Sequence, residues 1–119
     1  MTNKTADLLA RYASGERSFQ ETDIEDPDVL ALDDAVLEGA DFSRSFLVAS
    51  FQRANLRGAK FRDANVKTCD FSCADLTNAD FRGAALDATI FEGATLVGAR
   101  FAGAHVQGYE MADDELPVW

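Results

Sequence analysis

Large apolar residues recur at every fifth position along most of this chain. From Phe51 to Met111 the series is unbroken, and Phe alternates with Leu or Val. A helix repeats its buried face about every 3.6 residues and a strand about every second residue, so neither alone produces a period of five. A small residue stands two positions before each large one, and seven of the eight glycines, all but Gly15, stand two positions after. Each unit is therefore predicted to form one straight side followed by a turn, where glycine adopts a positive φ at little cost.

The individual units also carry a family signature. "ADLTN", "ADFRG", "ANLRG" and "ARFAG" broadly follow the order small residue, Asp or Asn, Leu or Phe, polar residue, and often Gly. Over about residues 35–112 the chain resembles the pentapeptide-repeat family. The resemblance implies an all-β fold, a right-handed quadrilateral β-helix with four repeats per coil.

With four units per coil, residues twenty apart stack above one another, so the alternation sorts the large residues into four columns. The predicted columns are Phe51, Phe71, Phe91 and Met111; Phe61, Phe81 and Phe101; Leu56, Leu76 and Leu96; and Val66, Leu86 and Val106. One column of small residues grows in size through Ala49, Cys69, Thr89 and Tyr109. Tyr109 is predicted to plug the last coil, and the buried hydroxyl of Thr89 to need a backbone acceptor.

The period of five breaks between Leu47 and Phe51, where the step is four. The missing residue predicts a bulge or tightened corner near residues 45–50. Such a corner is expected to push Phe46 or Val48 outward.

The chain is predicted to form one domain in three parts. Residues 1–18 are a capping helix and lead-in, residues 19–112 the β-helix, and residues 113–119 a C-terminal tail or cap. Units before about residue 35 are degenerate, with apolar centres at Phe19, Ile24 and Val29.

The two ends of such a solenoid expose its core and its strand edges, which caps must cover. At the first end, Thr5 is predicted to cap a short helix that Gly15 terminates. The face of this helix toward the coils comprises Leu8, Leu9 and Tyr12. At the other end, Val118 and Trp119 either fold back on the last coil or form an association surface, because exposed apolar groups usually mark contacts.

The net charge of -10 is unevenly distributed along the chain. Residues 1–38 carry -7, residues 39–108 carry +1, and residues 109–119 carry -4, so the acidity lies at the two ends. The first residues contain no long apolar run, so neither a secretory signal nor a membrane span is predicted, and a cytoplasmic location is expected. Cys69 and Cys73 fit reduced structural thiols better than a disulfide framework or a zinc site.

No arrangement of residues in the sequence predicts catalysis. The single histidine, His105, is expected to point outward without a nucleophile beside it. Asp70, Asp75 and Asp80 take outward positions on three different sides, so they diverge and form neither an acid/base pair nor a metal cluster. We therefore expect no enzymatic activity, no catalytic residue, no cofactor and no metal.

The side that carries Phe61, Phe81 and Phe101 is predicted to be the most basic region of the surface. The candidate partner-binding residues are Arg57, Lys60, Arg62, Arg82 and Arg100. Two interpretations are open. In one, Asp80 bridges Lys60 and Arg100 of neighbouring coils, and each such pair contributes little stability. In the other, the cations form a docking patch for an acidic partner.

The function predicted from these features is that of a rigid, non-enzymatic protein–protein interaction module with an unidentified partner. The family resemblance implies an alternative, mimicry of duplex DNA to bind DNA gyrase and confer quinolone resistance. B-DNA carries a negative charge about every 1.7 Å, and the repeat body, at +1, does not match it. We expect no direct binding of nucleic acid or membrane, and either a monomer or a homodimer formed through the C-terminal end.

Overall fold

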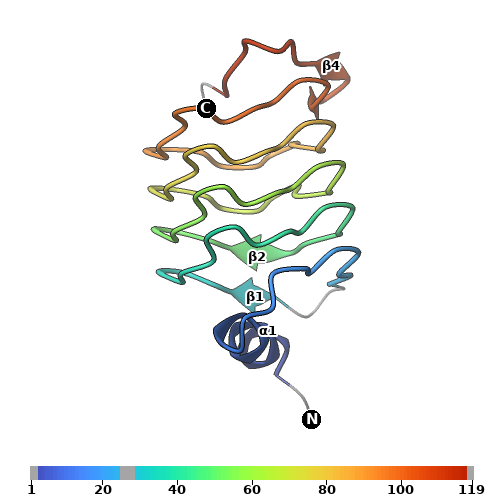
Figure 1. Ribbon diagram of the computed structural model, residues 1–119. Coiled ribbons are helices and arrows are strands. Elements are labelled where there is room, and N and C mark those ends of the chain that lie inside the picture. The colour runs from blue at the N-terminus through green and yellow to red at the C-terminus, as the bar shows by residue number, and fades with distance from the viewer. Residues whose placement is uncertain (1–2, 25–28, 118–119) are drawn as a thin grey trace.

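The protein is a rod of stacked coils with a helix at one end (Figure 1). The computed structural model describes residues 3–24 and 29–117, and the rod measures 40 × 26 × 22 Å along its principal axes. Helix α1 (Lys4–Ala13) covers the first coil. Among the described residues, no helix has the length and hydropathy that crossing a bilayer requires.

Regular strands are very short in this fold, because each side of a coil contributes only one or two residues to the ladder. Strand β1 (Leu30–Ala31) pairs in parallel with β2 (Ala49–Ser50), and β3 (His105–Val106) pairs antiparallel with β4 (Tyr109–Glu110). The remaining rungs are single parallel bridges. Stacking of these rungs gives a continuous ladder along the rod.

The predicted twenty-residue coil is confirmed in the regular part of the rod. Asp75 bridges Thr95, and from Ser50 onward every such pair is twenty residues apart. The N–H of Leu76 donates to the Thr95 carbonyl at 2.8 Å, and the Thr95 N–H donates to the Ala74 carbonyl at 2.9 Å. One residue on each side therefore links its coil to the preceding one by two hydrogen bonds.

The phenylalanines stack in two columns inside the rod, as predicted. The Phe61 and Phe81 ring centroids are 4.8 Å apart with planes within 6°. This column also includes Phe42 and Phe19, and the second column comprises Phe51, Phe71 and Phe91. Across the core the two columns meet edge to face, as Phe71 and Phe81 do at 5.4 Å and 87°. Both geometries are favourable for aromatic rings, so the interior is filled ring against ring.

The corners of each coil use left-handed backbone. Gly58 and Gly83 have φ of 68° and 73°, and non-glycine residues such as Thr68 and Ala88 adopt nearly the same conformation, with φ of 64° and 58°. Such angles are rare for side-chain-bearing residues, which explains why glycine recurs in this position.

The Asp or Asn that precedes the large residue stabilises the turn that follows. Its side-chain oxygen accepts a hydrogen bond from the N–H two residues further on, which is an Asx turn. The pairs are Asp41–Ser43, Asn55–Arg57, Asn65–Lys67, Asp70–Ser72, Asp75–Thr77 and Asp80–Arg82. These side chains are therefore committed to local structure.

The register break lies where the sequence predicts it. Phe46 bridges Asn65, nineteen residues on, whereas Ser50 bridges Asp70, twenty residues on. One residue is missing at the corner between them. Phe46 is 46% exposed because it occupies the outward position before the buried Leu47, and Val48 is half-buried.

The first coil follows the predicted degenerate units only in part. Phe19 and Ile24 are buried as expected, but Val29 is exposed and Leu30 takes the inward position. The reason is the parallel pairing of β1 with β2, which sets Leu30 opposite the inward Ala49.

The capping of α1 differs from the prediction. Asn3, not Thr5, is the N-cap, and its side chain accepts a hydrogen bond from the Ala6 N–H at 3.0 Å. The Thr5 hydroxyl instead accepts a hydrogen bond from the Ala31 N–H at 3.1 Å, which ties the helix to β1. Of the predicted contact face, Leu8 is buried and Tyr12 half-buried, whereas Leu9 is exposed.

The prediction that Tyr109 plugs the last coil is wrong. Gln107 and Gly108 both have positive φ, 49° and 85°, a combination typical of a two-residue hairpin turn, so the chain reverses between β3 and β4. Tyr109 is consequently 57% exposed. Met111 is buried but does not continue the column of Phe91, because its N–H donates to the Ala104 carbonyl at 2.7 Å.

Candidate functional site

The basic wall, defined by Lys60, Arg62, Asp80, Arg82 and Arg100, follows one face of the rod. Lys60, Asp80 and Arg100 pair as successive bridges, so they stand in one row parallel to the rod axis. Arg62 and Arg82 stand in a second row, one residue beyond the buried Phe61 and Phe81. The fold thus brings together the residues predicted for this wall.

A groove of about 560 Å³ crosses successive coils along the part of the basic wall that holds Lys60, Arg62, Asp80 and Arg82. It is lined by Gln20, Asp41, Ser43, Arg44, Lys60, Arg62, Asp63, Asp80 and Arg82. A Cβ on Gly83 would lie 2.1 Å from Oδ1 of Asp63, so only glycine permits the observed position of that carboxylate.

Asp80 is the central anion of the wall. Its Oδ1 accepts hydrogen bonds from the Arg82 N–H and Nε, both at 3.0 Å, and its Oδ2 accepts one from the second guanidinium nitrogen at 2.8 Å. Burial alone would raise the pKa of Asp80, but the hydrogen bonds from Arg82 and the charges of Arg82 and Arg62 lower it. The carboxylate is therefore ionised and already satisfied.

The predicted bridge from Asp80 to Lys60 and Arg100 is wrong. Asp80 turns along its own side of the coil to Arg82, because a guanidinium two residues on can be reached together with its N–H in one Asx turn. Within the described part of the chain, Lys60 and Arg100 form no ion pair. Arg62 approaches Asp80 only to 3.8 Å, without a hydrogen bond. The wall thus holds three cations whose donors are unused.

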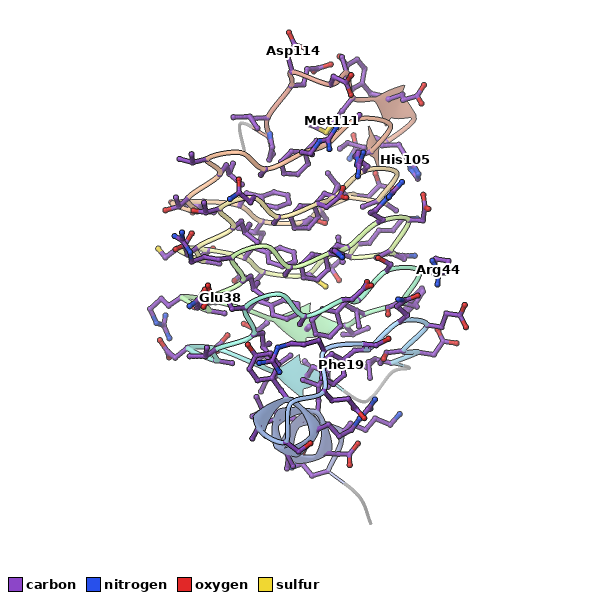
Figure 2. The ribbon with its side chains drawn as sticks, in the orientation of Figure 1. Phe19, Glu38, Arg44, His105, Met111 and Asp114 are labelled. Atoms are coloured by element: carbon purple, nitrogen blue, oxygen red, sulfur yellow. The ribbon has the colours of Figure 1, made fainter. Side chains whose placement is uncertain are left out.

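Arg57, a candidate partner-binding residue that the register placed just around the corner from this side, lies on the neighbouring face. Its guanidinium lies 3.2 Å from Asp75 and 3.9 Å from Glu38. Glu38 projects from the side of the rod opposite Arg44 (Figure 2). The corner that separates the two faces therefore excludes Arg57 from the groove.

Arg44 lines the groove but was not predicted as a site residue. It lies 3.4 Å from Glu21 and also hydrogen-bonds Gln20. It precedes the register break, so counting back in twenties from the regular coils assigns it to the wrong position. A count of nineteen, which the step from Leu47 to Phe51 indicates, places it opposite Asp63.

Comparison with protein families gives a direct match. The model described as "Pentapeptide repeats (8 copies)" matches residues 49–86 and 80–108, which together exceed half of the chain. The chain belongs to the pentapeptide-repeat family. A search of curated proteins found no match to this pentapeptide-repeat protein.

Solved structures of the family resemble this pentapeptide-repeat protein. Alr5209 from Nostoc PCC 7120 is 31% identical, with 92% of this chain and 86% of that chain covered and a TM-score of 0.50. Rfr23 from the cyanobacterium Cyanothece 51142 is 27% identical, with 69% and 58% covered and a TM-score of 0.56, so the chain spans a little over half of that relative. QnrB1, a plasmid-mediated fluoroquinolone resistance protein, is 17% identical, with 73% and 52% covered and a TM-score of 0.58. These relatives imply a right-handed quadrilateral β-helix.

The interior of this pentapeptide-repeat protein holds two polar groups that were predicted to be structural. The Thr89 hydroxyl donates to the Val66 carbonyl at 2.8 Å, which confirms the need for a backbone acceptor. Cys69 is buried, and burial raises the pKa of its thiol to about 12. Cys73 and His105 are exposed, at a corner and on a side respectively. Within residues 3–24 and 29–117, no group of three or more His, Cys, Asp or Glu residues could hold a metal ion.

The C-terminal end is only partly covered. Ala94, Leu96 and Ala99 have inward positions yet are only half-buried, because the chain reverses at β3 instead of adding another side above them. Within the described residues, the N–H of Leu96 and the carbonyls of Ala94 and Ala99 lack the partners that the equivalent groups one coil earlier have. Val118 and Trp119, the predicted association surface, lie outside the described residues.

Proposed function

We propose that this pentapeptide-repeat protein is a rigid, non-enzymatic module that binds another protein through the basic wall. One observation carries the proposal: among the described residues of the repeat body, Lys60 and Arg100 form no ion pair, and both stand on this wall beside Arg62, whose carboxylate neighbour Asp80 is held by Arg82. In residues 39–108 the other five basic residues each have a carboxylate within 3.7 Å. They are Arg44, Arg53, Arg57, Lys67 and Arg82.

The stacked coils favour binding of this kind. Each outward side chain is anchored on a backbone held by two ladders of hydrogen bonds and by a core packed ring against ring. A preformed surface loses little conformational entropy when a partner binds. Repeat rods commonly bind partners along their extended faces for this reason.

Affinity capture with charge-reversed variants tests the proposal. The test variant replaces Lys60, Arg62 and Arg100 with Glu, and the control variant replaces Arg53, Arg57 and Lys67 with Glu. Both change the net charge equally, but only the first alters the basic wall. We expect a partner retained by the wild type and the control variant to be lost by the test variant, with all three proteins folded by circular dichroism. Retention by the test variant would contradict the proposal.

Mimicry of duplex DNA has no comparable support. The likeness to QnrB1 is at 17% identity and concerns the fold alone. The groove alternates cations with Asp41, Asp63 and Asp80, whereas DNA presents an uninterrupted row of negative charge.

We further propose that two copies associate through the partly covered C-terminal end. An exposed strand edge beside half-buried apolar side chains is typical of an association surface. Light scattering over a range of protein concentrations should show a dimer that Leu96→Glu converts to a monomer. A wild-type monomer at every concentration would contradict this proposal. The proposal that the basic wall binds a protein would not be affected by that result.

A further inference from the structure

The row formed by Lys60, Asp80 and Arg100 has a spacing that restricts what can bind along it. The three residues are bridged in succession, so Lys60 and Arg100 are two rungs apart. With rungs about 4.8 Å apart, the two backbone positions are separated by about 9.6 Å along the rod axis. Between them the charge of Asp80 is neutralised by Arg82, which hydrogen-bonds both of its carboxylate oxygens.

Lys60 and Arg100, which form no ion pair in the described structure, therefore occur at alternate rungs with the neutralised Asp80 between them, and Asp41 continues the row one rung beyond Lys60. A complementary ligand needs two negative charges about 9.6 Å apart and an uncharged stretch between them. Residues on one face of an extended strand are about 6.7 or 13 Å apart, and neither distance matches the separation of about 9.6 Å between Lys60 and Arg100. A polyproline II segment advances about 3.1 Å per residue with three residues per turn, so its residues i and i+3 lie on one face about 9.3 Å apart.

We propose that the partner of the basic wall is an acidic, proline-rich segment in the polyproline II conformation, with carboxylates three residues apart on Lys60 and Arg100. The inference rests on the proposed function and specifies the chemistry of the same wall. The segment runs parallel to the rod axis, from the groove beside Lys60 and Asp80 to Arg100, which lies beyond the residues that line the groove. Arg62 supplies a third donor at the rung of Lys60, since Asp80, its ion-pair partner among the described residues, is held by Arg82.

The acidity of the whole chain does not prevent this binding. The repeat body carries +1, and the excess negative charge belongs to residues 1–38 and 109–119. At physiological ionic strength charges are screened over about 8 Å, which is short against the 40 Å length of the rod. A ligand on the wall therefore interacts mainly with the charges nearest to it, which are the wall cations and the groove carboxylates that alternate with them.

Fluorescence anisotropy with synthetic peptides tests the spacing directly. The probe is a labelled peptide of three Glu-Pro-Pro repeats, and the comparison peptide has the same composition with its three Glu residues adjacent. Measurements at 0.15 M salt with the full chain should show saturable binding of the probe, and binding of the comparison peptide about tenfold weaker. Equal binding of the two peptides, or no binding of the probe at millimolar protein, would overturn the inference.

Two neutralising variants assign the contacts. Lys60→Gln and Arg100→Gln should each weaken binding of the probe about tenfold, because each removes one charge-assisted hydrogen bond. The matched control is Lys67→Gln on the neighbouring face, which should leave the affinity unchanged. Both wall residues are exposed and lack ion pairs in the described structure, so unchanged melting temperatures are expected and confirm folding. An equal loss in the control would overturn the inference.

Peptide binding and affinity capture together distinguish a failure of this inference from a failure of the proposed function. If the charge-reversed wall loses a captured partner but the probe peptide does not bind, the wall is an interface of different chemistry and only this inference fails. If the wall variant retains every partner and the probe does not bind, both fail. Binding of a single-stranded oligonucleotide as tightly as the probe would overturn the assignment to an acidic peptide, since both present repeated negative charge.

Discussion

Thr68 provides a sharp test of the corner geometry, because it is β-branched and yet has a φ of 64°. Left-handed backbone costs a side-chain-bearing residue about 1–2 kcal/mol. Glycine avoids this cost but loses about 0.5–1 kcal/mol more backbone entropy on folding. The Thr68 N–H donates to the Asp87 carbonyl at 3.0 Å, a bond that glycine retains. Thr68→Gly should therefore raise the free energy of unfolding by about 1 kcal/mol.

A matched series ranks the corners by the strain that each relieves. Ala88 and Asn78 have φ of 58° and 61°, close to that of Thr68. Asn tolerates this conformation better than Ala, and Ala better than a β-branched residue. The gain on substitution by glycine should thus be largest for Thr68, intermediate for Ala88 and smallest for Asn78.

Replacement of a corner glycine by alanine is the opposite substitution and provides an internal control. Gly83→Ala should be more destabilising than Gly58→Ala, because an added Cβ meets Asp63 only at Gly83, whereas nothing lies within 4 Å at Gly58. Both lose the freedom of glycine at positive φ, so the difference reports the contact with Asp63.

Urea titration followed by circular dichroism measures these effects. For a chain of this length, a change of about 1 kcal/mol moves the thermal midpoint by about 3–6 °C, well within resolution. If Thr68→Gly lowers the urea midpoint at an unchanged m-value, or if Asn78→Gly gives the largest increase in the free energy of unfolding, the argument from left-handed strain is refuted.

Three further results follow from the structure. Burial would raise the pKa of Asp80, but hydrogen bonding to Arg82 lowers it in the folded protein. The ionised carboxylate therefore stabilises the fold fully above its unfolded pKa, and this stabilisation is lost as the pH falls through the folded pKa. The urea midpoint should fall between neutral pH and pH 2, and it should fall less in Asp80→Asn. Phe81→Leu should lower the free energy of unfolding by about 2–4 kcal/mol, against about 1 kcal/mol for Phe19→Leu, because Phe81 contacts four rings among the described residues and Phe19 one. Equal losses in chemical denaturation would contradict this. Iodoacetamide should modify Cys73 and spare the buried Cys69 with its raised pKa, as mass spectrometry of the folded protein can check.

The sequence was sufficient for the features that repeat. The spacing of five predicted the coil, and the alternation of Phe and Leu predicted the columns, because each is enforced at many equivalent positions. The step of four before Phe51 predicted that one coil is shortened, and the spacing between bridged residues indeed changes there from nineteen to twenty.

Features that occur once were harder to predict. Gly108 stands in the same position as every corner glycine, and only its neighbour Gln107, also left-handed, turns the corner into a reversal. Asn3 and Thr5 are both good helix caps, and the contact of Thr5 with Ala31, far along the chain, decides between them. The Thr5 contact is tertiary, and the reversal is made by two consecutive left-handed residues, so neither is specified by the five-residue pattern.

The partner of Asp80 shows the same limit at the candidate site. Register places Lys60 and Arg100 beside it at equal distance, one coil away on either side. Arg82 is closer in sequence and offers both its N–H and its guanidinium, so it takes both carboxylate oxygens. A side chain with several cations in reach is assigned by detailed geometry, which a periodic pattern does not specify.

The shortened corner before Phe51 has a consequence for how such a rod can change during evolution. Loss of one residue there is absorbed locally, because Phe46 and Ser50 still find their partners in the next coil. Gain or loss of five residues between Lys60 and Arg100 would instead turn everything beyond it by a quarter of the circumference and send the two cations to different faces. Only whole coils of twenty can lengthen the groove without breaking the row, so recognition surfaces in this architecture grow by duplication in units of four repeats, while single-residue changes accumulate at corners.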